Sequence, residues 1–304
     1  MPTTAARLTD SGRTVIISAS YRTDIPAFYG DWFQARLEAG FCRVANPYGG
    51  PESLVRLDAE AVQGFVFWTR NSLPFTPVLE ALSRRGTPFV VQYTITGYPR
   101  PLERSVIEGK RAIAAVRELA RRYGPKAVVW RYDPVFLTSL TPPAWHLSQF
   151  ERLADELAGA CDEVVLSFAQ IYAKTRRNSE RAARDHGFTW WDAEPEVKAT
   201  LLTSLAETAR QHGMTPSLCS QPDLLSASLT PARCIDGERL SAVAGRSISA
   251  RIRGNRPGCL CAQSKDIGAY DTCAHGCVYC YAVRSQSLGK RKQRAHDPVA
   301  ERLG

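Results

Sequence analysis

Three cysteines close together near the end of this 304-residue sequence are the residues best suited to chemistry. Cys273, Cys277 and Cys280 stand in the stretch CAHGCVYC, with the spacing C-x3-C-x2-C. Thiolates are soft ligands that select zinc or iron–sulfur centres. Structural zinc prefers four ligands, commonly as paired C-x2-C units, which this spacing does not provide. One short loop could instead hold three corners of a cubane and leave one iron open, and an open coordination site is what a catalytic metal needs.

Four further cysteines precede this loop and are also candidate metal ligands: Cys219, Cys234, Cys259 and Cys261. They would hold either an auxiliary iron–sulfur cluster or a zinc ion that stabilises the segment, and we favour such an auxiliary site. In a third interpretation, Cys261 completes a four-thiolate cluster with the main loop, which would make the protein an electron carrier. Cys42 and Cys161 fall in apolar segments and are expected to be buried. His275 is expected to shape the loop rather than to bind metal.

A second group of candidates consists of polar residues that follow predicted strands. An arginine directly after a buried strand must find an anion, because an unpaired buried charge is costly. The anion is either a substrate or a neighbouring aspartate, and the set as a whole predicts a substrate pocket. We assign catalytic roles to Arg22, Asp24, Arg131, Asp133 and Lys174, and cofactor contacts to Asn46 and Tyr279.

Short apolar runs that alternate with helical patterns must position these residues. Runs rich in Val, Ile, Phe and Tyr are typical of buried parallel strands, and they cover residues 14–20, 41–46, 64–69, 88–96, 127–133, 163–170 and 214–219. Apolar periodicity predicts helices over residues 103–123, 145–158 and 195–213. The alternation predicts an α/β fold, namely a (β/α) TIM-type barrel, complete or partial. An open doubly wound sheet is the alternative, although no Gly-rich phosphate loop follows the first strand.

The strand–helix alternation stops near Leu218. We therefore predict a barrel over residues 1–218 and a cysteine-rich, iron–sulfur-binding extension over residues 219–304 that packs on the barrel mouth. Chemistry in barrels of this kind gathers at the carboxyl ends of the strands, so the extension must reach that end.

Composition and charge narrow the class of protein. The sequence is 44% hydrophobic and 23% charged, as in ordinary globular proteins. No run approaches the length needed to cross a bilayer and no apolar signal core begins the chain, so we expect no membrane association and a cytoplasmic location. The nine cysteines are then expected to be reduced or metal-bound. From Gly245 onward there are 11 basic and 4 acidic residues, which indicates either attraction to nucleic acid or an anionic substrate, or merely a solvated tail.

The stretch CAHGCVYC, with an aromatic residue before its last cysteine, resembles the cluster-binding loop of radical S-adenosyl-L-methionine (radical SAM) enzymes. With the following Tyr-Ala it is most similar to the spore photoproduct lyase-like branch. The resemblance implies that Cys273, Cys277 and Cys280 hold a 4Fe–4S cluster whose fourth iron binds SAM. It further implies that one electron, from a donor such as a ferredoxin or flavodoxin, generates a 5′-deoxyadenosyl radical.

The whole chain also resembles an uncharacterised prokaryotic family, the domain of unknown function DUF1848. The stretches that carry this resemblance are SASYRTDIPAFYGDWF, FWTRNSLP, VVWRYDP, LSFAQIYAKT and SKDIGAYDTCAHGCVYCYA. It implies a barrel with a radical-SAM-like loop and no established reaction. Two features depart from the radical SAM pattern. The cysteine loop follows the barrel instead of its first strand, and Pro51 interrupts the only match to a Gly-Gly-Glu motif.

The sequence therefore predicts a radical SAM-type enzyme that acts on an unknown substrate bound at the barrel mouth. Two alternatives remain open: a non-catalytic iron–sulfur protein for electron transfer or sensing, and a nucleic-acid-binding or repair protein with a structural cluster. A zinc protein is the least elaborate alternative.

Overall fold

A single parallel sheet organises the protein. The computed structural model describes residues 14–47 and 49–304. Eight strands lie in the order β10-β1-β4-β5-β6-β7-β8-β9, and every neighbouring pair is parallel. This confirms the predicted α/β class. The strands are β1 (Val15–Ala19), β4 (Val62–Thr69), β5 (Phe89–Thr94), β6 (Val128–Val135), β7 (Glu163–Phe168), β8 (Thr215–Leu218), β9 (Thr230–Pro231) and β10 (Ser264–Asp266).

The edges of this sheet are the two shortest strands, β9 and β10. Within the described residues no strand pairing joins them, so the sheet is open and a complete barrel is not formed. One backbone hydrogen bond links the segments beside the two edges, from Ala262 N to Ile235 O at 2.8 Å. Both edge strands come from the segment after residue 218, so this segment completes the sheet on both sides.

The predicted second strand does not belong to this sheet. β2 (Phe41–Val44) pairs antiparallel with β3 (Ser53–Arg56), which was not predicted, in a separate two-stranded sheet. Strands of a parallel sheet with both faces covered need a near-continuous apolar run. β2 buries Cys42 fully but has Arg43 in its middle, so it suits a partly covered hairpin.

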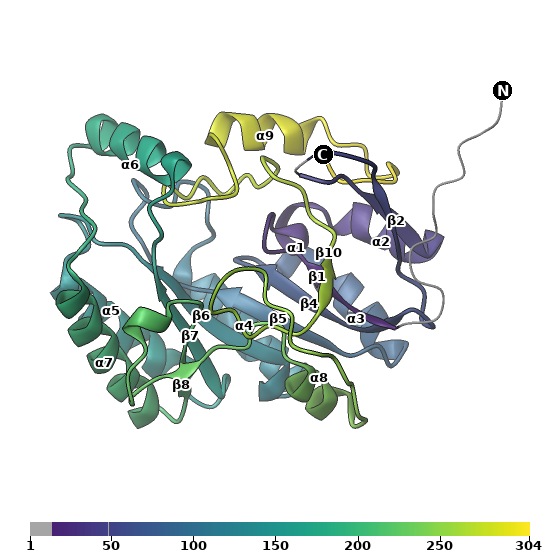
Figure 1. Cartoon of the computed structure of the whole chain (residues 1–304), viewed down its shortest axis with the longest axis horizontal. Coiled ribbons are helices and arrows are strands. Elements are labelled where there is room, and N and C mark those ends of the chain that lie inside the picture. Colours follow the sequence, from purple (N-terminus) through teal and green to yellow (C-terminus); the bar gives the residue numbers. More distant parts are fainter. Residues whose placement is uncertain (1–13, 48) are drawn as a thin grey trace.

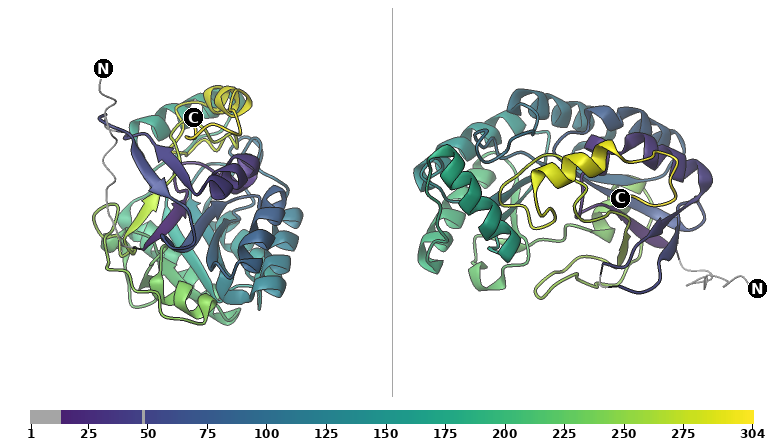
Figure 2. Two further views of the ribbon diagram at one scale, coloured as in Figure 1. Left: turned by 90° about the vertical axis from the view of Figure 1, so that its right-hand side faces the viewer. Right: turned by 90° about the horizontal axis from the view of Figure 1, so that it is seen from above.

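Helices cover one face of the large sheet and form the main core, as Figures 1 and 2 show. In α4, Ala112, Ile113 and Val116 are buried at helical spacing, and Phe150 of α5 stacks on Trp130 of β6 with ring centroids 4.7 Å apart. The helices on this face are α2 (Gly30–Ala39), α3 (Thr76–Arg84), α4 (Gly109–Tyr123), α5 (Pro143–Leu157) and α7 (Pro195–Gln211). The short α1 (Ile25–Phe28) follows β1 directly.

The other face of the sheet is covered by the late part of the chain. Side chains alternate between the two faces along a strand, so Ile16, Val90 and Val129 point away from the helices above. They form a second core with Ile235, with Leu240 of α8 (Gly237–Ala244) and with the residues around Cys261. The chain then runs through β10 and across the carboxyl ends of the strands to α9 (Gln286–Arg294), drawn in yellow in Figures 1 and 2. Among the described residues, no helix has the length and apolar character that crossing a bilayer requires.

Candidate functional site

The loop that carries Cys273, Cys277 and Cys280 lies against residues that follow several strands of the sheet. Val278 N donates to Leu102 O, beyond β5, at 3.0 Å. Thr175 Oγ1, in α6 (Ala173–His186) beyond β7, donates to the carbonyl of Tyr279 at 3.3 Å. These contacts place the loop at the carboxyl ends of the parallel strands.

The three thiols of this loop line one pocket. Its volume is about 610 Å³, including space that opens to solvent, and His275 also lines it. The rim is formed by polar side chains of α6, α9 and the neighbouring loop: Arg104, Asn178, Arg181, Asp185 and Gln286. Burial is the main cause that raises the pKa of Cys277 to about 12, and burial followed by the negative charges of Asp24 and the neighbouring thiols raises that of Cys273. Without a metal, these cysteines are therefore neutral thiols.

His275 is held by a buried carboxylate. Its Nε2 lies 2.7 Å from Oδ2 of Asp24, and both side chains are buried. A carboxylate only accepts hydrogen bonds, so Nε2 carries the proton in this pair. The other ring nitrogen, Nδ1, is buried and has no hydrogen-bond partner among the described residues. The oxygens of Asp24 also accept from the backbone N–H groups of Ala27 and Arg70, so this predicted catalytic residue is engaged in positioning the loop.

A second buried network anchors the end of the loop. Arg70 Nη1 lies 2.6 Å from a carboxylate oxygen of Glu103, and Arg70 Nη2 donates to the hydroxyl of Tyr279 at 2.7 Å. Tyr279 in turn donates to Glu103. Tyr279 was assigned to cofactor contact, and its hydroxyl is used here to fix the loop. The sequence analysis missed Glu103, because it placed this residue at the start of a helix over residues 103–123. In the structure α4 begins only at Gly109, and Glu103 lies in the irregular segment before it.

Arg22 finds its anion inside the protein. Its Nε donates to Oδ1 of Asp266 at 2.8 Å, and the same carboxylate accepts from the hydroxyls of Ser18 and Ser20 at 2.9 and 2.7 Å. Asp266 was not predicted as a site residue, because β10 is too short to give a strand pattern. Arg22 therefore pairs with an aspartate inside the protein, which was one of the two interpretations, but the partner is Asp266 and not the neighbouring Asp24.

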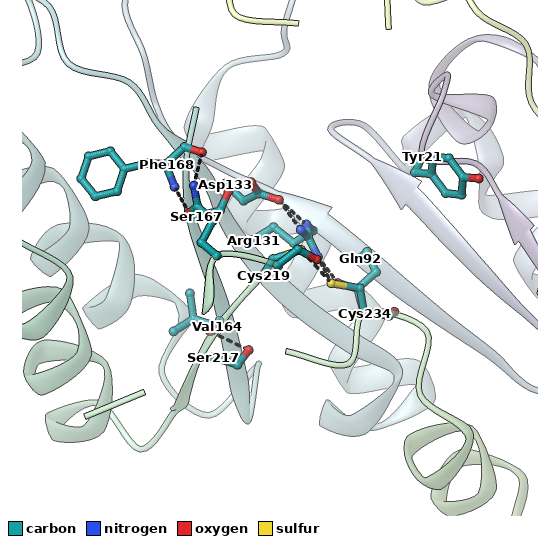
Figure 3. Close-up of polar contacts among 12 residues, drawn as sticks. Tyr21, Gln92, Arg131, Asp133, Val164, Ser167, Phe168, Ser217, Cys219 and Cys234 are labelled. Carbon is teal, nitrogen blue, oxygen red and sulfur yellow. Dashed lines mark hydrogen bonds and ion pairs between the residues drawn. The ribbon is translucent and has the colours of Figure 1, made fainter. Parts of the chain in front are cut away.

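Arg131 also pairs internally, as Figure 3 shows. It forms an ion pair with Asp133, donates to Gln92 Oε1 at 3.0 Å and donates to the sulfur of Cys234 at 3.1 Å. Ser167 donates to the second oxygen of Asp133. This arrangement brings together the ends of β5, β6 and β7 on the sheet face opposite the main helices.

The four upstream cysteines lie together on that same face. Cys219 and Cys234 have sulfur atoms 3.5 Å apart, and Cys261 is close enough to act on the pKa of both Cys234 and Cys259. The effect of Cys261 is the main cause that lowers the pKa of Cys259 to about 5. Arg256 Nη2 donates to the sulfur of Cys219 at 3.3 Å. In the described part of the chain, no three or more His, Cys, Asp or Glu side chains are placed to hold a single metal ion.

The remaining predicted residues fall in two places. Lys174, in α6, places its ammonium 5.1 Å from the ring centroid of Tyr270 and acts electrostatically on Cys280, so it lies near the cysteine loop. Asn46 follows β2, which belongs to the separate two-stranded sheet. The prediction that Asn46 lies at the end of a strand of the large sheet is therefore wrong. Cys42 and Cys161 are buried in the main core, as predicted.

Comparison with known proteins identifies a family. No curated protein matches the chain. A solved structure described as "Crystal structure of D-hydantoinase" is similar with a TM-score of 0.30 and 11% sequence identity, over 69% of this chain and 41% of that chain. This likeness is too weak to support an argument about fold or function. The family described as Domain of unknown function (DUF1848) matches residues 16–282, a segment that includes all nine cysteines. The chain therefore belongs to the DUF1848 family.

Proposed function

We propose that this chain is an iron–sulfur enzyme of the radical SAM type, in which Cys273, Cys277 and Cys280 hold a 4Fe–4S cluster. One observation carries the proposal: three thiols of one short loop line a single pocket at the carboxyl ends of parallel strands. No other described cysteine lines that pocket. Cubane clusters ordinarily take four thiolates, so three leave one iron without a cysteine ligand.

The donor set fits such a cluster. Thiolates are the ligands that iron–sulfur centres select, and each thiolate of a cubane binds a different iron. The three sulfurs therefore need not converge on one point, as they would around a single ion. Beside them, Nδ1 of His275 is a buried nitrogen that has no partner in the described part of the chain, and a bound group in the pocket would satisfy it.

When bound, a cluster of this type together with SAM supplies a 5′-deoxyadenosyl radical that takes hydrogen from a substrate. The protein's own residues position the loop and provide charge. Asp24 orients His275, and the Arg70–Glu103 pair fixes Tyr279. Lys174 acts electrostatically on Cys280, so it would attract the carboxylate of SAM or an anionic substrate.

Substrate would bind beside Lys174, toward the face of the sheet that lies opposite the main helices. Arg22 and Arg131 are already paired with carboxylates there. In this proposal they therefore fix the position of neighbouring groups and do not bind the substrate themselves. An electron donor such as a ferredoxin or flavodoxin would supply the electron.

The test is anaerobic reconstitution with iron and sulfide, followed by iron analysis and electron paramagnetic resonance of the reduced protein with and without SAM. We expect about four irons in the loop cluster and a signal that changes on adding SAM. The variant Cys277→Ala should lose this signal, whereas Cys42→Ala, which removes a buried thiol elsewhere, should keep it. A protein that takes up zinc but no iron would overturn the proposal.

A second candidate function rests on His275. A histidine that binds metal usually donates its other ring N–H to a carboxylate, and the Asp24–His275 pair has this arrangement. His275 Nδ1 as a fourth ligand would close the cluster and make the protein an electron carrier or sensor. In that case the wild-type signal would ignore SAM, and His275→Ala would alter the signal and open an iron to SAM. If the protein is instead a radical SAM-type enzyme, the signal of the wild-type protein itself changes when SAM is added.

A further inference from the structure

We propose that Cys219, Cys234, Cys259 and Cys261 bind one zinc-class divalent ion that joins the two edges of the open sheet. This site is separate from the cysteine loop of the proposed function and does not depend on it.

The spacing of the sulfur atoms favours a single ion over a cluster. Zn–S bonds are about 2.3 Å long, so two thiolates of a tetrahedral site lie about 3.8 Å apart. The sulfurs of Cys219 and Cys234 are 3.5 Å apart, and the sulfur of Cys261 accepts from the backbone N–H of Ile235, the residue that follows Cys234. Thiolates of a cubane bind separate irons and stand farther apart.

The cysteine loop provides the contrast. Among the described residues, no thiol–thiol hydrogen bond joins Cys273, Cys277 and Cys280, although all three line one pocket. One pair of upstream sulfurs is in direct contact and no pair of described loop sulfurs is hydrogen-bonded, and from this difference we infer that the two groups serve different metals.

Positive charge is placed against the sulfurs of the upstream group. Arg131 Nη1 donates to Cys234 at 3.1 Å and Arg256 Nη2 donates to Cys219 at 3.3 Å. The backbone N–H of Ile235 donates to Cys261 at 3.4 Å. Four thiolates around a divalent ion carry a net charge of −2, which two guanidinium groups would balance. Such outer donors to ligand atoms are typical of metal sites.

The positions of the four cysteines in the fold indicate a structural role for the bound ion. Cys219 follows β8, and Cys234 follows the edge strand β9. Cys259 and Cys261 precede the opposite edge strand, β10. No strand pairing joins these two edges in the described residues, so an ion held by all four thiols would connect them. A closed site with four protein ligands is the form that structural zinc takes.

In the described structure the four thiols are not yet placed around a common point that could hold an ion. Binding therefore requires the thiols to turn about their χ1 angles toward a common centre. Staggered rotamers differ by about 120° in χ1, so a sulfur can change its direction without a movement of the backbone.

The first test is metal content. Protein isolated without added iron should contain about one zinc per chain, held with the tetrahedral ligand set of structural sites. Cys234→Ser and Cys261→Ser should lower zinc affinity at least tenfold, whereas Cys42→Ala should not. Cys277→Ala should also keep its zinc, and this separates the two sites: loss of the loop cluster tests the proposed function and leaves this inference standing.

A measurement on the unaltered chain guards against variants that fail to fold. Alkylation followed by peptide mass spectrometry should find these four cysteines protected in the zinc-loaded protein and reactive after chelation. Cobalt(II) in place of zinc should give the absorption of a tetrahedral thiolate complex. Equal alkylation with and without zinc, or iron and sulfide bound by these cysteines in Cys277→Ala, would overturn the inference, the latter by assigning an auxiliary cluster.

Discussion

At the scale of single residues, buried charges explain most of the polar positions that the sequence singled out. Arg22 and Arg131 each follow a strand and each meets a carboxylate, Asp266 and Asp133 respectively. Removing one partner of such a pair costs about 3–5 kcal/mol, because the other charge stays buried and unpaired. These arginines are therefore held in fixed positions, which suits groups that shape a pocket.

His146 provides a pH-dependent test of the core. It is fully buried, its Nδ1 lies 2.8 Å from the Tyr132 hydroxyl, and burial lowers its pKa to about 4. Its folded pKa lies below the unfolded value of 6.5, so the unfolded state binds the proton first as pH falls. This group therefore lowers the free energy of unfolding between pH 6.5 and 4, by about 3 kcal/mol in total, and adds no further change below pH 4.

The comparison is with His146→Gln, which keeps a hydrogen-bonding side chain but does not titrate. Urea unfolding from pH 7 to pH 4 should show a smaller loss of stability for the variant than for the wild-type protein, by about the same 3 kcal/mol. Parallel pH profiles for the two proteins would show that His146 titrates normally in the folded state.

At the scale of elements, α9 is packed directly on the cysteine loop. A Cβ at Gly289 would lie 2.2 Å from the carbonyl oxygen of Cys273, so only glycine permits this approach. Gly289→Ala should therefore push α9 away from the loop, lower stability by about 1–3 kcal/mol and reduce the iron retained after reconstitution.

Gly109 is the matched control for that experiment. It also lies in a helix, α4, and a Cβ there would meet nothing within 4 Å. Gly109→Ala should change stability by less than about 1 kcal/mol and leave iron content unchanged. Equal effects of the two substitutions on urea unfolding and iron content would rule out the close packing of α9 as the cause.

The elements also mark how far sequence reasoning reaches. β1, β4, β5, β6 and β7 are buried apolar runs, and their pattern predicted both their type and their parallel pairing. β9 and β10 span only two and three residues, and their pairing depends on partners far away in the chain, so no local pattern exists. Asp266 was not predicted as a site residue for the same reason, because it lies in β10. The contact between Cys219 and Cys234 likewise comes from tertiary structure, although their residue type alone made them candidates.

At the scale of the whole molecule, the segment after residue 218 is part of the sheet. It supplies β9 at one edge and β10 at the other, and it covers the face opposite the main helices. We therefore expect residues 14–304 to unfold as one cooperative unit, despite the predicted boundary at residue 218. Calorimetry should give a single transition in which the calorimetric and van't Hoff enthalpies agree. Two separated transitions would indicate an independent domain.

The pairing of β1 with β10 has a consequence for the order of synthesis. Ser18 and Asp266, which share a hydrogen bond across these strands, are separated by 248 residues. At a translation rate of 5–20 residues per second, about 12 to 50 s pass between the synthesis of β1 and that of β10. During this time β1 lacks its partner at the edge of the sheet. An uncovered edge strand invites pairing with other chains. The nascent protein therefore passes through a vulnerable interval, and the cysteine loop emerges only after it.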